Sequence, residues 1–284
     1  MGELKEKMAR DLALRNLAAG TQKQYLSCCC NFVRYHMVSP RKLGLGDIKD
    51  FLGQLLREAA SPQKLKMHVA GIKFLYGTTL DRQQVADKIP WPKVADKKPD
   101  ILSGTETEKL LAAVGNLKTG VVLTTAYAAG LRIGEACRLK PEDIDSKRGL
   151  IKVLGKGNKE RYVMLSERLL VILRAYWKQT QPKGDWLFPG GKNGKPLTAS
   201  AVAKALAFAV KKAKLRKHVT PHTLRHSFAT HLLETGTDIR VIQKLLGHGS
   251  IHSTAHYTQV SRLHIATVKS PMDLLGTKRA AAMR

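Results

Sequence analysis

A stretch rich in proline and lysine interrupts this chain about one third of the way along. Residues 90–99 contain three prolines and three lysines with few apolar side chains. Proline removes a backbone donor and breaks regular structure, so the stretch predicts a linker. The 284 residues suffice for two domains, each with its own core. We therefore expect an N-terminal domain at 1–92, a linker at 93–101 and a second domain at 102–284.

Apolar periodicity predicts mostly helices on both sides of the linker. The expected N-terminal helices are 21–36, 48–56, 61–76 and a short one near 85–89. After the linker, helices are expected at 105–114, 119–128, 132–139, 166–179, 198–215, 220–236 and 237–247, with a short one from Ser253 through Tyr257 and a last one at 262–269. Two strands, 150–154 and 161–165, flank a glycine-rich hairpin turn at 155–159. The fold class is mainly α with a small antiparallel β-sheet.

The net charge of +27 indicates a polyanionic partner. Up to Asp100 there are 18 basic against 10 acidic residues, and beyond it 31 against 12, so both parts are basic. Nucleic acid is the usual partner of so basic a chain. A ribosomal protein, or a basic soluble protein without such a partner, is the competing interpretation of charge alone.

The cysteines and the apolar runs indicate a cytoplasmic protein. Cys28, Cys29 and Cys30 are contiguous and Cys137 stands alone, which matches neither a disulfide framework nor a metal site. No apolar run approaches the roughly 18 residues of a membrane span, and the charged N-terminus lacks a signal-peptide core. We expect no membrane partner.

The segment from Thr220 to Leu232 combines groups suited to a phosphate. Thr220 is a good helix N-cap, and Pro221 suits the first helical position. His222 and Arg225 then lie three residues apart, next to the positive end of the helix dipole. A base, a bidentate cation and a helix N-terminus therefore converge on one spot, which favours chemistry on an anion.

A zinc site is the competing interpretation of the histidines in this segment. His222 and His226 are four residues apart and His231 follows, but Glu234 is the only acid on this helix and no cysteine is near. Zinc requires three or four ligands at defined spacing. We expect His226 and His231 to be packed or hydrogen-bonded helix residues, and we expect no metal and no cofactor.

Two further cations stand in short glycine-containing motifs. Arg132 has a guanidinium fork that matches phosphate oxygens, and Glu135 three residues later is placed to hold it. Lys156 lies at the tip of the predicted hairpin, where it can reach a DNA strand. Taken singly, each is more often a solvated surface charge.

The order of these motifs along the chain resembles the tyrosine recombinase family, which includes phage integrases and Xer-type recombinases. The motifs are Gly-Leu-Arg-Ile-Gly-Glu from Gly130, Gly-Lys-Gly-Asn-Lys-Glu-Arg from Gly155, His-Thr-Leu-Arg-His from His222, Leu-Leu-Gly-His-Gly from Leu245, and Tyr257. The resemblance implies an N-terminal helical core-binding domain of SAM-like fold, followed by a catalytic domain of DNA breaking-rejoining fold. The implied catalytic residues are Arg132, Lys156, His222, Arg225, His248 and Tyr257.

The resemblance also implies a role for each residue. Tyr257 attacks the scissile phosphate and forms a 3′-phosphotyrosyl link, while His222 accepts its proton. Arg132 and Arg225 hold the non-bridging oxygens, and Glu135 orients Arg132. Lys156 donates a proton to the leaving 5′-oxygen, and His248 helps to place Tyr257. Because the phosphotyrosine conserves the bond energy, neither ATP nor a metal is required.

The implied partner is double-stranded DNA with an inverted-repeat core site, gripped by a C-shaped clamp. Four protomers are expected to assemble on two sites, and a partner recombinase or accessory protein is a further possible partner. The expected location is the cytoplasm of a bacterium, in association with the nucleoid, and the recombined DNA is a chromosome or a mobile element. The apolar segment 261–275 either covers its own core or docks on a neighbouring protomer, and the resemblance favours docking.

Two other functions stay open on the sequence. A site-specific DNA-binding protein that does not cut is disfavoured by the complete set of six catalytic residues. A nicking-closing enzyme similar to type IB topoisomerases would share the chemistry but act on one site, whereas strand exchange needs two.

Overall fold

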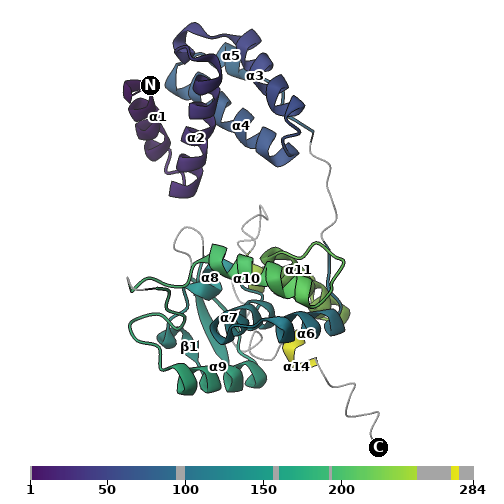
Figure 1. Ribbon diagram of the computed structural model, residues 1–284. Helices are drawn as coiled ribbons and strands as arrows, with labels where there is room; N and C mark the ends of the chain where they lie inside the picture. Colours follow the sequence, from purple (N-terminus) through teal and green to yellow (C-terminus); the bar gives the residue numbers. More distant parts are fainter. Residues whose placement is uncertain (1, 94–99, 156–159, 192–193, 248–269, 275–284) are drawn as a thin grey trace, which may run out of the picture. The chain divides into compact units, whose positions relative to one another are not determined.

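The computed structural model describes residues 2–93, 100–155, 160–191, 194–247 and 270–274. It consists of two compact units, one ending at Lys97 and the other beginning at Lys98 (Figure 1). This division lies inside the predicted linker at 93–101. Each unit has an apolar core of its own.

The N-terminal unit is helical throughout its described residues. Its elements are α1 (Gly2–Leu14), α2 (Ala19–His36), η1 (Pro40–Lys42), α3 (Leu45–Arg57), α4 (Pro62–Phe74), η2 (Leu75–Thr79) and α5 (Gln83–Asp87). The core is aromatic, because the ring of Phe32 meets those of Phe51 and Tyr76 edge-on at centroid distances of 5.4 and 6.3 Å. These rings fill the space between α2, α3 and η2.

The sequence predicted most of these helices but missed α1. Its buried residues Leu4, Met8 and Leu12 recur every four residues, which is the pattern of one helix face. Ser61 caps α4 as its hydroxyl accepts a hydrogen bond from the N–H of Lys64. The helix predicted to run to residue 76 changes to a π-helical turn, η2, after Phe74.

The C-terminal unit surrounds a small antiparallel sheet with helices. Its elements are α6 (Gly104–Ala113), α7 (Leu117–Ala128), α8 (Ile133–Cys137), η3 (Pro141–Asp143), β1 (Ile144–Asp145), β2 (Leu150–Leu154), β3 (Glu160–Met164), α9 (Glu167–Thr180), α10 (Ala199–Lys212), α11 (Pro221–Glu234), α12 (Ile239–Leu246) and α14 (Pro271–Leu274). The strands are ordered β1-β2-β3, with Ile151 opposite Val163 and Val153 opposite Arg161. The predicted class, mainly α with a small antiparallel sheet, is confirmed, and the two-residue β1 is an addition.

Helix α7 is the centre of this unit. All its residues from Val121 to Ala128 are buried, and it packs against α6, α8, α9, α10, α11 and α14. The chain leaves α7 directly into the turn that carries Arg132, while α11, which carries His222 and Arg225, packs on its side. Two motifs far apart in the sequence are therefore placed together by the most buried helix of the unit.

Residues 270–274 lie on the core of their own unit. The side chain of Met272 is only 6% exposed, and the Ser270 hydroxyl donates a 2.6 Å hydrogen bond to the carbonyl oxygen of Ala128. For Ser270, Pro271 and Met272, which are buried, the covering interpretation holds. The rest of the segment 261–275 lies outside the described residues, so docking on a neighbour stays a prediction for it. Among the helices of the described residues, none is long and apolar enough to span a membrane.

Candidate active site

A glycine turn after α7 places Arg132. Gly130 has a φ of +61°, a conformation that suits glycine, and a Cβ at this position would collide with the ring of Phe228 in α11. Arg132 follows as the N-cap of α8, and its backbone N–H donates a 2.8 Å hydrogen bond to Oε2 of Glu135. The turn thus brings the Arg132 backbone and side chain close to α11.

Helix α11 begins as the sequence predicted, but its first turn has fewer free backbone N–H donors than the sequence suggested. Thr220 and Thr223 form a reciprocal cap, in which each backbone N–H donates to the other residue's hydroxyl oxygen. Pro221 has no N–H. These bonds occupy the N–H groups of Thr220 and Thr223, so the first turn of α11 has fewer backbone donors to offer an anion than the sequence suggested.

The centre of the site is one buried carboxylate surrounded by arginines, which we call the Glu135 cluster: Glu135, Arg132, Arg161 and Arg225. The predicted pair is present, with Nη1 of Arg132 3.0 Å from Oε1 of Glu135. Arg161 binds the same carboxylate bidentately, at 3.0 Å to Oε1 and 2.7 Å to Oε2. Nη1 of Arg225 lies 3.8 Å from Oε2.

Burial and charge act in opposite directions on the pKa of Glu135. Burial alone would raise the pKa, but the hydrogen bonds from the Arg161 side chain and from the Arg132 N–H outweigh it and lower the pKa to about 2. The carboxylate is therefore ionised across the physiological range. It supplies one negative charge to three arginines, so the cluster keeps a net positive charge.

Arg225 is held more deeply than Arg132. Its side chain is 5% exposed, whereas that of Arg132 is 39% exposed. Arg225 donates a 2.7 Å hydrogen bond to the carbonyl oxygen of Gly130 and another to that of Leu246. Burial, and then repulsion by Arg132, lowers the pKa of Arg225 to about 10, which still leaves it charged at neutral pH.

Sequence reasoning did not assign a role to Arg161, although a signal was present. Arg161 and Val163 share one face of β3, and Val163 is fully buried, so Arg161 also points toward the interior. A charged side chain on an inward face requires a buried partner of opposite charge. The partner, Glu135, lies 26 residues earlier in the chain.

An open cleft of about 380 Å³ lies beside the cluster and brings several predicted residues together. Arg132, Gly155 and His222 line it, and so does Arg138, an exposed cation that the sequence reasoning also missed. The imidazole of His222 is exposed. Arg225 does not line the cleft and lies behind Arg132 and Glu135.

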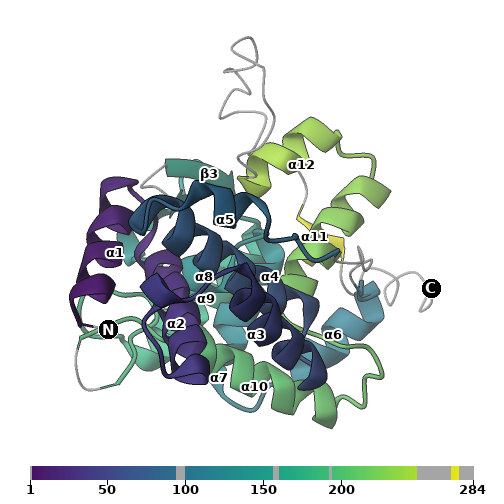
Figure 2. The same ribbon diagram turned by 90° about the horizontal axis from the view of Figure 1, so that it is seen from above.

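Three predicted catalytic residues, Lys156, His248 and Tyr257, lie outside the described residues. The described chain nevertheless reaches the position before two of them. Gly155 lines the cleft and precedes Lys156. Gly247, the left-handed C-cap of α12 that the sequence predicted, precedes His248. Helices α11 and α12 lie side by side, as Figure 2 shows.

The other histidines of α11 differ from each other. Nε2 of His231 lies 2.9 Å from the carbonyl oxygen of Leu102, and Nδ1 lies 2.8 Å from the Tyr127 hydroxyl, so the predicted hydrogen-bonding role is confirmed. His226 is exposed, so of the two predicted alternatives, packed or hydrogen-bonded, the packed one is wrong for this residue. The described residues contain no group of three His, Cys, Asp or Glu side chains placed to hold a metal.

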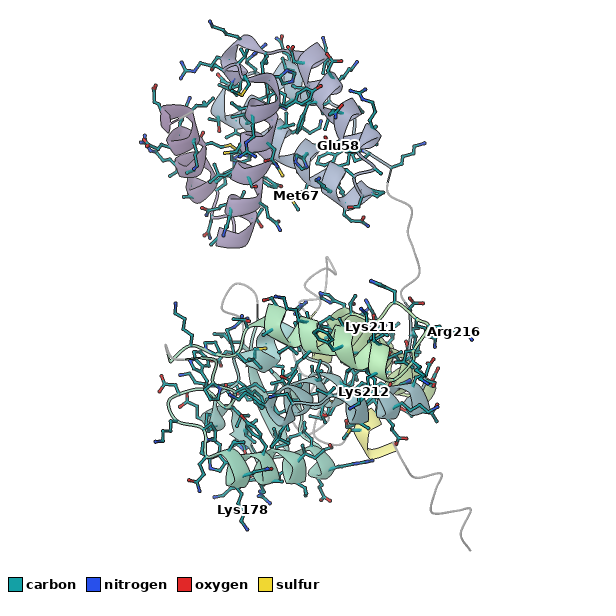
Figure 3. The ribbon with its side chains drawn as sticks, viewed as in Figure 1. Glu58, Met67, Lys178, Lys211, Lys212 and Arg216 are labelled. Carbon is teal, nitrogen blue, oxygen red and sulfur yellow. The ribbon has the colours of Figure 1, made fainter. Side chains whose placement is uncertain are left out.

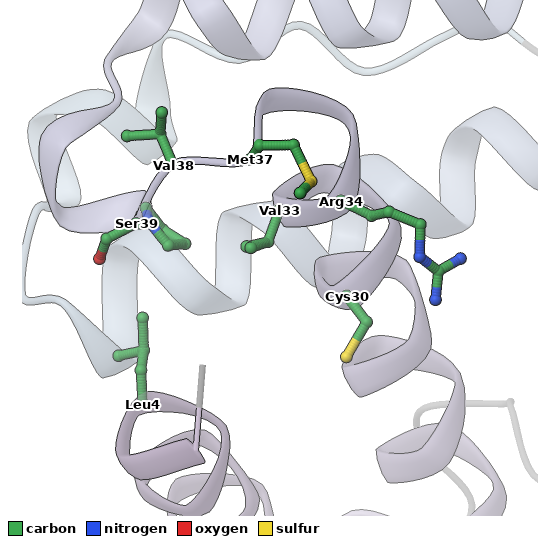
Figure 4. Close-up of a pocket in the computed structure, with 8 residues that line it drawn as sticks. Leu4, Cys30, Val33, Arg34, Met37, Val38 and Ser39 are labelled. Carbon is green, nitrogen blue, oxygen red and sulfur yellow. The ribbon is translucent and has the colours of Figure 1, made fainter.

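Two further surface features lie outside the cleft, one in each unit. An apolar hollow of about 440 Å³ in the N-terminal unit lies between the start of α1 and the end of α2, with Leu4, Cys30 and Met37 among its lining residues (Figure 4). In the C-terminal unit, Lys211, Lys212 and Arg216 project from the end of α10 and the segment after it (Figure 3). The hollow carries no charged cluster, whereas the α10 end adds to the basic surface.

The chain matches a family over most of its length. Residues 100–264 match the phage integrase family, and residues 4–85 match the N-terminal SAM-like domain of phage integrases. The putative integrase/recombinase y4qK of Sinorhizobium fredii is 45% identical over 278 residues, which cover 97% of this chain and 90% of the relative. The tyrosine recombinase XerD of Listeria innocua is 34% identical over 275 residues, covering 89% of this chain and 92% of that protein.

The solved structures agree on the fold. A lambda integrase fragment, crystallised as a dimer bound to a COC′ core site, has a TM-score of 0.73 at 18% identity, and the match covers 90% of this chain and 99% of that one. At this identity the likeness shows the fold alone, which is that of a SAM-like domain joined to an integrase catalytic domain. Given the two family matches and the identities to its relatives, this chain belongs to the phage integrase family and is a tyrosine recombinase.

Proposed function

We propose that this chain is a site-specific recombinase that cuts and rejoins duplex DNA by transesterification, through a 3′-phosphotyrosyl link to Tyr257. The observation that carries the proposal is the cleft in which a half-exposed Arg132 and an exposed His222 stand beside the buried Glu135 cluster. A net positive, rigidly bonded site next to a free imidazole is suited to a phosphodiester that gains charge during attack.

Each described residue has a part in this reaction. A free tyrosine has a pKa near 10, so only about one in a thousand is ionised at pH 7 and a base is required. His222 would accept the proton of Tyr257. Arg132 presents the part of its guanidinium that Glu135 does not hold, and it binds a non-bridging oxygen. Arg225, which is held behind the cleft by the carbonyl oxygens of Gly130 and Leu246, supports that oxygen with its positive charge.

Lys156 and His248 enter the proposal through their places in the chain. Lys156 follows Gly155, which lines the cleft, and would donate the proton to the leaving 5′-oxygen. His248 follows the C-cap of α12 and would bond the phosphate beside Tyr257. The partners proposed are double-stranded DNA with an inverted-repeat core site and three further protomers on two such sites. Segment 261–275 beyond its described part would dock on a neighbour.

The first experiment traps covalent protein–DNA adducts in cells that carry the native locus and maps them by sequencing, with Tyr257→Phe as the matched control. Removal of one oxygen leaves the charge and the fold unchanged, so the variant should bind DNA and form no adduct. Adducts at discrete inverted-repeat sites in the wild type alone support the proposal. Enrichment of DNA without a Tyr257-dependent adduct would instead indicate a protein that binds and does not cut.

A second experiment tests Lys156 on the mapped site. Lys156→Ala should lower the cleavage rate by about 10² to 10⁴, the usual range for one general acid. A 5′-bridging sulfur should restore most of the rate, since a thiolate leaves without a proton. Absence of rescue would assign Lys156 to phosphate binding.

Relaxation of a plasmid with one site, without exchange between two sites, would favour the topoisomerase-like alternative.

A further inference from the structure

Arg161 joins two elements that the proposed chemistry needs to hold in register. Its Nη1 and Nη2 donate to both oxygens of Glu135, and its Nε donates a 2.9 Å hydrogen bond to the carbonyl oxygen of Leu245 in α12. The side chain is 13% exposed. One guanidinium thus uses three of its donors on two elements, a geometry that the planar fork of arginine provides and lysine does not.

The elements joined in this way adjoin predicted catalytic residues. Arg161 is the second residue of β3 and follows Lys156 by five residues in the sequence. Leu245 lies three residues before His248, and Glu135 holds Arg132. The base of the hairpin, the end of α12 and the Arg132 guanidinium therefore meet at one ion pair. A shift of Arg161 would move all three relative to the cleft.

The C-cap of α12 supports the same arrangement independently. Gly247 has a φ of +61°, and a Cβ there would lie 3.0 Å from Cδ and 3.2 Å from Nε of Arg161. The α12 backbone passes so close to Arg161 because glycine leaves that space empty. The Leu246 carbonyl accepts from Arg225, so the end of α12 is attached to two arginines of the cluster.

We propose that Arg161 is a positioning residue for strand transfer, which fixes strand β3 and the end of α12, the elements next to Lys156 and His248 in the sequence, to the carboxylate that orients Arg132. The inference rests on the proposed function. Arg161 itself does not line the cleft and is not proposed to touch DNA. Its loss should therefore slow the chemical step more than it weakens DNA binding.

The test measures single-turnover cleavage of a suicide duplex built on the mapped site by the full chain, together with the dissociation constant for that duplex. Arg161→Gln should lower the cleavage rate about 10- to 100-fold, as loss of an orienting contact does, while binding changes less than about threefold. Arg161→Lys can keep one bond to Glu135 but not the bond to Leu245 as well. Its cleavage rate should therefore lie between those of the wild type and Arg161→Gln. Arg174→Gln, at an exposed position of α9, removes the same charge and should match the wild type.

A pH profile separates positioning from a general loss of stability. The charged groups that face Glu135 are Arg132 of the α8 cap, Arg161 of β3 and Arg225 of α11, while α12 contributes carbonyl oxygens. Without Arg161 the burial of Glu135 is less compensated, so its pKa should rise and cleavage by Arg161→Gln should fall at mildly acidic pH, where the wild type stays active. Carbon-13 NMR of the Glu135 carboxyl should titrate at higher pH in the variant than in the wild type.

The outcomes are distinct. Equal cleavage rates and equal carboxyl titration in wild type and Arg161→Gln would overturn this inference and leave the proposed function standing. Binding that falls as much as cleavage would also overturn it, because Arg161 would then contact DNA. Absence of any Tyr257-dependent adduct in the wild type would overturn the proposed function itself. Should Arg161→Gln fail to fold, Arg161→Lys at wild-type rate would be the overturning result.

Discussion

The cores of the two units differ in how they treat charged groups. The N-terminal core consists mainly of apolar side chains and aromatic rings around Phe32, with His68 and Thr79 among its few buried polar side chains and an apolar hollow at its edge. The C-terminal core is equally apolar around α7, but at one side it buries the Glu135 cluster. Apolar packing tolerates a hollow, whereas a buried ion cluster requires each charge to keep its partner. Substitutions in the N-terminal core should therefore lower only the free energy of unfolding. Substitutions in the Glu135 cluster should lower both the free energy of unfolding and the rate of DNA cleavage.

The largest expected effect on stability lies in the aromatic core. Phe32→Ala removes a ring that is fully buried against Phe51 and Tyr76, which should cost about 3–5 kcal/mol of unfolding free energy. Hydrogen exchange followed by mass spectrometry should show loss of protection within the N-terminal unit alone. Equal loss of protection in both units would break the comparison, because it would mean that they unfold together.

Glu135→Gln should affect both properties. Neutralising the carboxylate leaves Arg161 and Arg225 buried near each other without a counter-charge, at a cost of about 3 kcal/mol. Arg132 also loses the partner that orients it, so single-turnover cleavage should fall about 10²- to 10³-fold. Urea unfolding and adduct formation measure the two effects. Glu142→Gln, whose partner Lys140 is on the surface, is the control expected to change neither. Normal adduct yield in Glu135→Gln would contradict the role of the cluster.

The pH dependence of the cluster follows from the lowered pKa of Glu135. Because the folded pKa of about 2 is below the ordinary value of 4.5, the carboxylate stabilises the fold above pH 4.5, and this contribution is lost as the pH falls toward 2. The stability difference between wild type and Glu135→Gln should therefore be smaller at pH 3.5 than at pH 7, by about 1 kcal/mol. Urea titrations at both pH values measure it. A constant difference would mean that Glu135 is not held as an ion.

The smallest effect is expected at a partly exposed ion pair. Nζ of Lys217 lies 2.6 Å from Oε2 of Glu106, with the two side chains 38% and 27% exposed. Water screens such a pair, so Lys217→Ala should cost less than about 1 kcal/mol and leave cleavage unchanged. The same urea and adduct measurements apply. If Lys217→Ala lowered the free energy of unfolding as much as Glu135→Gln does, burial would not explain why one ion pair contributes more to stability than the other.

The elements that the sequence predicted best depend on local signals. The caps at Ser166, Thr220 and Gly247 are set by a side chain or a backbone preference within one turn, and each is present in the structure. The pairing of Arg132 with Glu135 was predictable for the same reason, since the two residues are three apart.

The features that the sequence reasoning missed depend on distant contacts. Arg161 meets Glu135 across 26 residues and Leu245 across 84, and neither spacing has a local signature. The depth of Arg225 also follows from the approach of α11 to the Gly130 turn. Helix α1 is a different case: its four-residue apolar spacing was readable, but its charged residues hid it.

The contacts of Leu102 have a consequence for how the C-terminal unit forms during synthesis. Its N–H donates to the Ser227 hydroxyl and its carbonyl oxygen accepts from His231, across 125 and 129 residues. On the ribosome, the backbone N–H and carbonyl groups of Leu102 lack these two partners until α11 has been synthesised. Contacts this distant in sequence close late and slow folding. The surroundings of His222 and Arg225 therefore include a backbone segment that precedes them by more than a hundred residues, and they are complete only once α11 has been synthesised.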